Sequence, residues 1–209
     1  MSTTFDVIPA SRANVKFGEV LDLAQGHVNT FLDDFEIEER IKLQAELIGE
    51  IARRDAAFDE VFEWPRKTYA WISVRNVPGG TDAYCDTIKD DDDPDKPWWF
   101  LDELRTAPNY STALEERLLA ARNHDIRWSF RRSAGQPAII NVAYGLIAAS
   151  LAELTDGLIY SGDSAWDYKM LPATGPELRD VYFRPKSASQ PDKADWAEQC
   201  IASLRRGIF

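Results

Sequence analysis

The chain has 209 residues, of which 44% are hydrophobic and 11% aromatic, and it carries a formal net charge of −11 at pH 7. This composition excludes a disordered chain and predicts one globular domain over residues 1–209, since domains commonly hold about 100–200 residues. The acidic balance disfavours nucleic acids and anionic membranes as partners, and no stretch reaches the roughly 18 apolar residues of a membrane span. Because only two cysteines and no export signal are visible, we expect a cytoplasmic protein.

The N-terminal part of the chain predicts an extended segment and then two helices. Phe5, Val7 and Ile8 form a short run that Pro9 ends, which indicates an edge strand or a lead-in segment. Residues 17–35 place apolar side chains at steps of three and four, the pattern of an amphipathic helix. Residues 37–58 mix apolar positions with many charges and predict a long helix with one buried side.

The middle of the chain predicts a strand and then an acidic loop. Residues 68–75 alternate in polarity as a strand does, and a Pro-Gly-Gly turn at 78–80 ends it. We expect a solvated loop over residues 81–97, with clustered carboxylates at Asp90, Asp91, Asp92, Asp93 and Asp95. The loop lacks the glycine and the closing glutamate of a calcium site. Trp98, Trp99 and Phe100 follow directly, and at least one of them is expected in the core.

Residues 126–161 predict a strand, a helix and a second strand, and the rest of the chain is expected to pack around this unit. Alternation over 126–131 indicates the first strand, and Pro137 suits the first turn of a helix whose only charge is Glu153. A helix with so few charges should be covered on both sides. Gly157 fits the left-handed position after the helix, before a strand at 158–160. The predicted fold is therefore an α+β domain, a mixed β-sheet with helices packed on it.

Capping boxes predict two further short helices. Thr112 with Glu115 and Thr174 with Glu177 have the required spacing of Ser or Thr before Glu. A last helix should begin near Pro191 and end in Arg205-Arg206, which complement the helix dipole.

The sequence contains no recognised catalytic or metal-binding motif. His27 and His124 are far apart, and CxxC, GxGxxG, GxxxxGK[ST] and GxSxG are absent. We therefore expect no enzyme activity, no cofactor and no metal. A pairing of a cysteine with His124 in the folded chain stays open.

One polar cluster is expected at the ends of the two central strands. If the helix between them is a right-handed crossover, the strands run parallel and their C-terminal ends meet at one edge. That edge would hold Arg127, Arg131, Arg132, Asp163, Trp166 and Asp167. Two interpretations stay open: the groups bind a substrate, or they form ion pairs that order the loop carrying Trp166.

The stretch LAELTDGLIYSGDSAWDY, within residues 127–168, resembles the C-terminal part of immunity proteins from bacterial polymorphic-toxin and type VI secretion loci. The resemblance implies a small acidic α+β protein that binds and neutralises one cognate toxin in the cytoplasm, without catalysis of its own. Acidic charge agrees with a basic partner, although many cytosolic proteins are acidic for solubility alone.

The surface expected to bind the partner comprises the acidic segment with Trp98 or Trp99 beside it. Carboxylates would steer a basic protein and an aromatic side chain would anchor it. Two alternatives remain, a small-molecule-binding protein or enzyme that uses the Arg and Asp edge, and a structural subunit.

Overall fold

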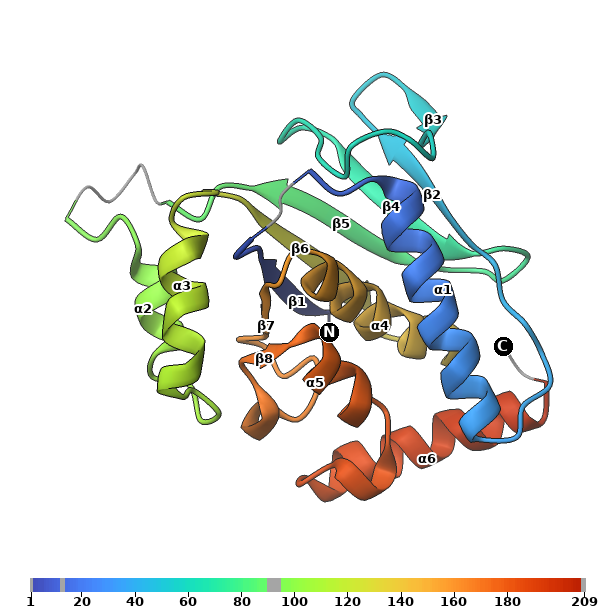
Figure 1. Ribbon diagram of the computed structural model, residues 1–209. Coiled ribbons are helices and arrows are strands. Elements are labelled where there is room, and N and C mark those ends of the chain that lie inside the picture. The colour runs from blue at the N-terminus through green and yellow to red at the C-terminus, as the bar shows by residue number, and fades with distance from the viewer. Residues whose placement is uncertain (1, 12–13, 90–94, 208–209) are drawn as a thin grey trace.

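Eight strands form a single sheet in the order β3-β2-β4-β5-β6-β1-β7-β8 in the computed structural model, which describes residues 2–11, 14–89 and 95–207 (Figure 1). The strands are β1 (Ser2–Ile8), β2 (Leu43–Ile48), β3 (Arg53–Asp55), β4 (Tyr69–Val74), β5 (Thr81–Asp86), β6 (Arg127–Ser133), β7 (Leu158–Tyr160) and β8 (Ala173–Thr174). The helices are α1 (Phe17–Asp34), α2 (Trp99–Leu104), α3 (Glu115–Ala121), α4 (Ala138–Leu154), α5 (Gly175–Val181) and α6 (Pro191–Arg205). The α+β fold is confirmed.

The central unit β6-α4-β7 forms as the sequence predicts, but another strand lies between its two strands. β1 pairs antiparallel with both β6 and β7, so that Asp6 lies opposite Ser129 on one side and Tyr160 on the other. β6 and β7 therefore run in the same direction without touching. All pairings between the described strands are antiparallel, so the sheet is not mixed. β1 is a central strand, and its expected position at an edge is wrong.

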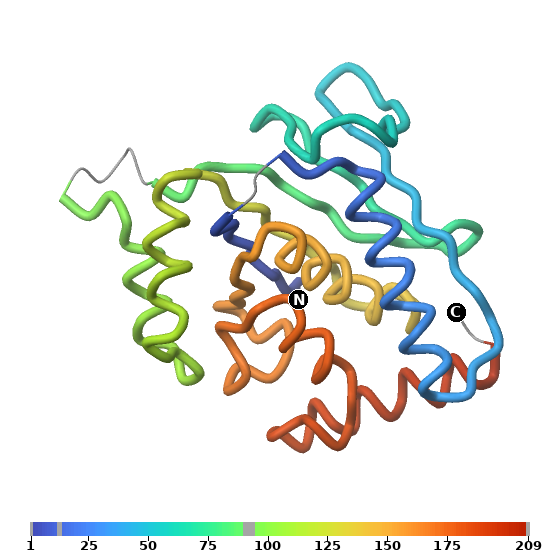
Figure 2. Tube along the Cα trace, in the orientation of Figure 1, coloured from blue at the N-terminus to red at the C-terminus, as the bar shows by residue number. Residues whose placement is uncertain are grey.

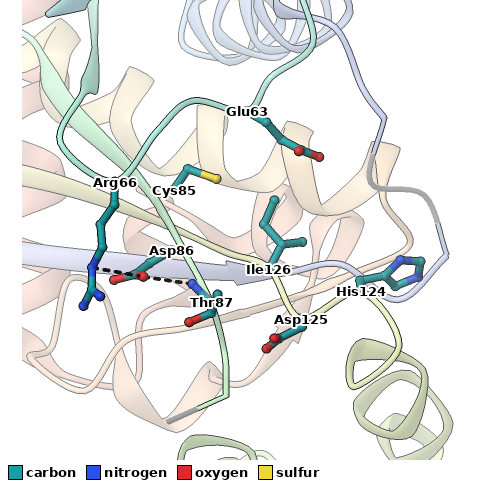
Figure 3. Close-up of a pocket in the computed structure, with 8 residues that line it drawn as sticks. All are labelled: Glu63, Arg66, Cys85, Asp86, Thr87, His124, Asp125 and Ile126. Carbon is teal, nitrogen blue, oxygen red and sulfur yellow. Dashed lines mark hydrogen bonds and ion pairs between the residues drawn. The ribbon is translucent and has the colours of Figure 1, made fainter. Parts of the chain in front are cut away.

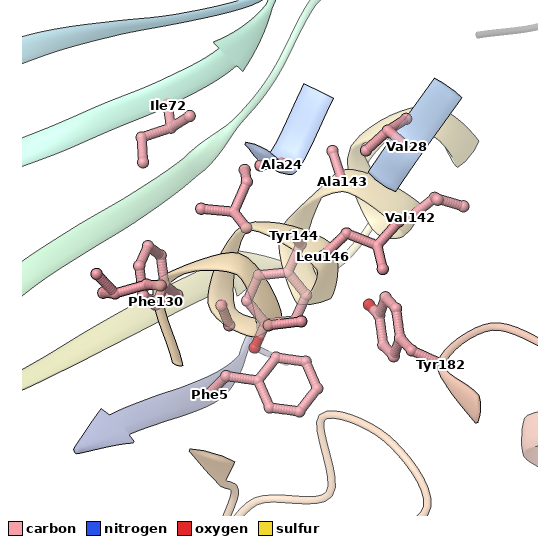
Figure 4. Close-up of a cluster of buried hydrophobic side chains, with 14 of the residues drawn as sticks. Phe5, Ala24, Val28, Ile72, Phe130, Val142, Ala143, Tyr144, Leu146 and Tyr182 are labelled. Atoms are coloured by element: carbon pink, nitrogen blue, oxygen red, sulfur yellow. The ribbon is translucent and has the colours of Figure 1, made fainter. Parts of the chain in front are cut away.

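Helix α4 is the core of the molecule, covered by the sheet on one side and by α1, α5 and α6 on others (Figures 1 and 4). Its side chains from Ile139 to Ala152 are buried. The ring of Tyr144 lies 4.9 Å from that of Phe5, and the Tyr182 hydroxyl donates to the carbonyl of Asn141 at 2.6 Å. The sparse charge of this helix thus reflects burial on all sides. Within the described residues, no helix has the length and apolar character needed to cross a membrane.

Residues 37–58 do not form the predicted helix; they form the hairpin β2-β3. Leu43, Ala45 and Leu47 are buried and alternate with exposed or half-buried side chains, while β2 pairs along its whole length with β4. The side chains of Asn29 and Gln25 on α1 accept the backbone N–H groups of Ile41 and Leu43. Contacts distant in sequence therefore override the local preference for helix.

The expected loop at residues 81–97 is shorter than predicted, because Thr81–Asp86 forms β5 between β4 and β6. Two short helices, α2 and α3, follow at this end of the molecule (Figure 1). They cover part of the outer sheet face, where Ile8 and Leu158 pack with Phe100, Leu101 and other apolar side chains in a second small core.

The residues predicted to cap the helix ends are found at some of these ends and not at others. The capping box of Thr174 and Glu177 is confirmed, whereas Glu115 instead binds Arg105 and Tyr110. The left-handed residue after α4 is Asp156, with φ 47°, and not Gly157. A Cβ at Gly157 would lie 2.3 Å from the carbonyl oxygen of Ile8, so this glycine allows close strand approach.

The predicted C-terminal helix is confirmed as α6, which passes beside the end of α1 (Figure 2). There Nε of Arg205, the last residue of α6, donates to the carbonyl of Phe35 at 3.1 Å. This hydrogen bond connects the C-terminal end of α6 to the C-terminal end of α1.

Candidate functional site

Within the described residues, none of the arginines expected at the sheet edge forms an ion pair or hydrogen bond with Asp163 or Asp167. Nε of Arg127 lies 3.8 Å from Oδ1 of Asp6, and Nε of Arg131 lies 3.8 Å from Oδ2 of Asp82. Both carboxylates come from neighbouring strands, since the register places Asp82 opposite Arg131. These ion pairs tie strands of the sheet together.

Arg132 is only 8% exposed and serves the core instead of the edge. Its guanidinium donates to Oδ1 of Asn141 at 2.5 Å and to Oγ1 of Thr3 at 3.1 Å. The rings of Tyr144 and Trp196 have centroids 5.5 and 4.9 Å from its Cζ, which gives the buried cation two aromatic faces.

Asp163 and Asp167 order the segment that carries Trp166. Oδ1 of Asp163 accepts the backbone N–H of Thr4 at 2.9 Å, and Asp167, which is buried, accepts the N–H groups of Ser189 at 2.5 Å and Gln190 at 3.2 Å. Burial acts to raise the pKa of Asp167, but the hydrogen bonds that it accepts outweigh this effect and hold the pKa below its ordinary value.

Trp166 itself lies in the core, with its ring stacked at 5.2 Å on that of Phe183. Asp163, Trp166 and Asp167 therefore all have structural contacts in this fold.

Of the expected partner surface, the structure describes Asp95, Trp98 and Trp99, whereas Asp90, Asp91, Asp92 and Asp93 lie outside the described residues. Trp99 is 44% exposed. Trp98 is half-buried against the second small core, with the guanidinium of Arg122 5.6 Å from its ring centroid. Phe100 is buried, as expected for at least one member of this aromatic run.

A cleft of about 460 Å³ opens where β5 ends (Figure 3). It is lined by Glu63, Arg66, Cys85, Asp86, Thr87, His124, Asp125 and Ile126. Three carboxylates and one guanidinium line it, so the cleft is acidic. Sequence reasoning missed it, because its walls come from three separate segments. The pairing of β5 with β6, which the sequence pattern did not predict, sets Asp86 opposite Arg127 and so brings residues 85–87 beside 124–126.

Backbone hydrogen bonds hold two of the three carboxylates in place. Oδ1 of Asp86 accepts the N–H of Thr87 at 2.9 Å, and Oδ1 of Asp125 accepts the N–H of Lys89 at 2.8 Å. Asp125 has φ 47°, a left-handed conformation that Asp tolerates better than most residues. Lys89 is thus anchored at the cleft immediately before the acidic segment begins.

Cys85 and His124 both line the cleft but do not form a catalytic pair. Figure 3 shows the imidazole turned away from the thiol, and Nε2 of His124 lies 3.2 Å from the carbonyl oxygen of Ala10. Burial, together with the nearby Glu63 and Asp86 carboxylates, raises the pKa of the Cys85 thiol to about 11. The thiol is protonated at neutral pH and so is a weak nucleophile.

The acidic cleft is suited to binding a positively charged group. Within residues 2–11, 14–89 and 95–207, no group of three or more His, Cys, Asp or Glu side chains is arranged to hold a metal ion.

Comparisons with protein families, with curated proteins and with solved structures find no match for this chain.

Proposed function

We propose that the protein is an immunity protein, which binds and neutralises a cognate secreted bacterial toxin in the cytoplasm without catalysis of its own. The resemblance of residues 127–168 supports this class. A net charge of −11 favours a basic partner through long-range attraction.

The observation that carries the proposal is the composition of the surface at one end of the sheet. The acidic cleft gathers residues from three segments at the end of β5, and the exposed ring of Trp99 follows this end of β5 in the chain. The acidic segment lies between Lys89 and Trp98 in the sequence. Carboxylates raise the rate of encounter with a basic protein, and a tryptophan is among the side chains that contribute most to affinity at interfaces. The partner surface that we propose therefore combines steering and anchoring groups.

A co-expression experiment tests this function. The protein encoded immediately upstream of this chain's gene is expressed in a bacterial host, alone and with this chain. We expect growth arrest by the upstream product alone and normal growth when both are present. Growth arrest that persists at equal expression of the two proteins would overturn the proposal.

The matched variants for this experiment are Trp99→Ala and Tyr168→Ala, both at exposed aromatic side chains of the described chain. Trp99→Ala should weaken protection, whereas Tyr168→Ala, outside the proposed surface, should protect as the unchanged protein does.

A further inference from the structure

We infer that the cleft at the end of β5 receives a basic side chain, arginine or lysine, that the protein partner presents. The inference rests on the proposed function for the source of that side chain, and on the cleft itself for its chemistry.

The dimensions and walls of the cleft suit a long basic side chain. Its volume of about 460 Å³ lies within the roughly 300–1,000 Å³ typical of small-ligand pockets. Ile126 and Cys85 offer apolar surface, while Glu63, Asp86 and Asp125 offer carboxylates (Figure 3). Arginine and lysine combine an apolar stem with a charged end, so one such side chain can use both kinds of wall.

Two of the three carboxylates are positioned before any ligand arrives. Asp86 and Asp125 each use Oδ1 to accept a backbone N–H, which fixes the side chain. The second oxygen of each carboxylate has no recorded hydrogen bond within the described part of the chain and can accept one from a ligand. A guanidinium donates in a fork that suits paired oxygens, and an ammonium donates three hydrogen bonds.

A guanidinium of the chain itself already lies at this cleft. Nε of Arg66 is 3.5 Å from Oδ1 of Asp86, and the Arg66 side chain is 83% exposed. Such a long, exposed ion pair is weak, because solvent screens it and the side chain loses little by leaving. Arg66 thus already places a guanidinium beside Asp86, and an incoming basic group can replace it.

The test is a titration followed by NMR, with N-acetyl-arginine amide as the probe and N-acetyl-citrulline amide as its uncharged counterpart. The backbone amides of Thr87 and Lys89 report on the cleft, because they donate to Asp86 and Asp125. We expect saturable shifts of these amides with the arginine compound and none with the citrulline compound. The shifts should weaken several-fold between low salt and about 0.3 M salt, where charges farther apart than a few ångströms are screened.

Three variants sharpen the test. Combined Glu63→Gln, Asp86→Asn and Asp125→Asn substitutions keep an oxygen for each backbone N–H but remove the charges, and should abolish the shifts. The matched control neutralises three exposed carboxylates elsewhere, at Asp22, Glu38 and Glu39, and should leave the shifts unchanged. Arg66→Ala should strengthen binding about two- to threefold, since a competing cation is removed.

Equal shifts with both compounds, or binding that survives neutralisation of the cleft, would overturn the inference. The upstream-encoded protein separates it from the proposed function. If the neutralised cleft still protects cells fully, the partner does not use the cleft and the inference fails, while the proposed function stands. If the unchanged protein gives no protection, the proposed function fails, and the titration alone decides whether the cleft takes a basic side chain.

Discussion

Single buried polar residues in this protein hold together segments that are distant in sequence. Asp167 joins the turn after β7 to residues 189–190, and Arg132 joins β6 to α4 and β1. One of the two interpretations left open by the sequence was that Asp163 and Asp167 order the loop of Trp166. It could not predict the atoms that they bind, because those lie on other segments that only the folded chain brings close.

Asp167→Asn should lower the free energy of unfolding by about 1–3 kcal/mol. Oδ1 of Asp167 accepts the N–H of Lys169 and Oδ2 accepts those of Ser189 and Gln190, so an amide NH₂ in place of either oxygen leaves backbone N–H groups without an acceptor. Asp163→Asn is the control. Oδ1 of Asp163 alone accepts from Thr4 and Ser161, and asparagine keeps such an oxygen. Urea denaturation measures both variants, and an equal loss in the two would contradict this account of Asp167.

The pH dependence of stability provides a second prediction for Asp167. Its pKa in the folded protein is lowered, so its contribution is complete above the unfolded pKa of about 3.9 and is lost as pH falls through the folded value. Between pH 5 and the acid range, Asp167→Asn should therefore show a shallower loss of stability than the unchanged protein. Parallel stability curves for the two proteins would show that this carboxyl does not carry the effect.

At the level of elements, the sequence correctly predicted the helices and strands whose residue pattern fits only one type of secondary structure. The spacing in α1, the low charge of α4 and the alternation in β4 and β6 each agree with the structure. The helix predicted over residues 37–58 was wrong because the pattern there is ambiguous. Leu43, Leu47 and Ile51 fit helical spacing, while Leu43, Ala45 and Leu47 equally fit the alternation of a strand. Pairing with β4 decides between them, and local sequence does not contain that information.

The packing of α4 against α5 gives a prediction with an internal control. A Cβ at Gly145 would lie 2.3 Å from the ring of Tyr182, whereas a Cβ at Gly26 of α1 meets nothing within 4 Å. Gly145→Ala should lower the melting temperature because the ring must shift. Gly26→Ala should raise stability by up to about 1 kcal/mol through helix propensity. Thermal unfolding followed by circular dichroism measures both, and a tolerated Gly145→Ala would mean that this helix contact is looser than described.

At the scale of the whole molecule, the order of the strands in the sheet brings together the cleft residues, which are distant in sequence. The cleft joins Glu63 and Arg66, the end of β5, and the residues after α3, because β5 and β6 are neighbours in the sheet. The acidic character of this end was visible in residues 81–97, but the cavity was not. The arginines and aspartates expected at the sheet edge have partners from several elements: β1 supplies Asp6 to Arg127, β5 supplies Asp82 to Arg131, and residues 189–190 donate to Asp167.

The proposed surface predicts that anchoring and steering can be separated by mutation. Trp99→Ala should raise the rate of dissociation from the toxin about tenfold or more, with little effect on association, since truncated interface tryptophans commonly cost above about 2 kcal/mol. Tyr168→Ala should change neither rate. Surface plasmon resonance measures both variants, and unaltered dissociation of Trp99→Ala would remove Trp99 from the interface.

The most direct test of the central claim, that this acidic end captures a basic protein, is the association rate of the purified chain with the upstream-encoded protein, followed by stopped-flow fluorescence across a range of salt. We predict fast association that slows about tenfold or more towards 0.3 M salt, and a flatter dependence when Glu63, Asp86 and Asp125 are neutralised, because screening removes the same attraction that the substitutions remove. Failure of the two proteins to associate, or an association rate that salt and these substitutions leave unchanged, would contradict the account.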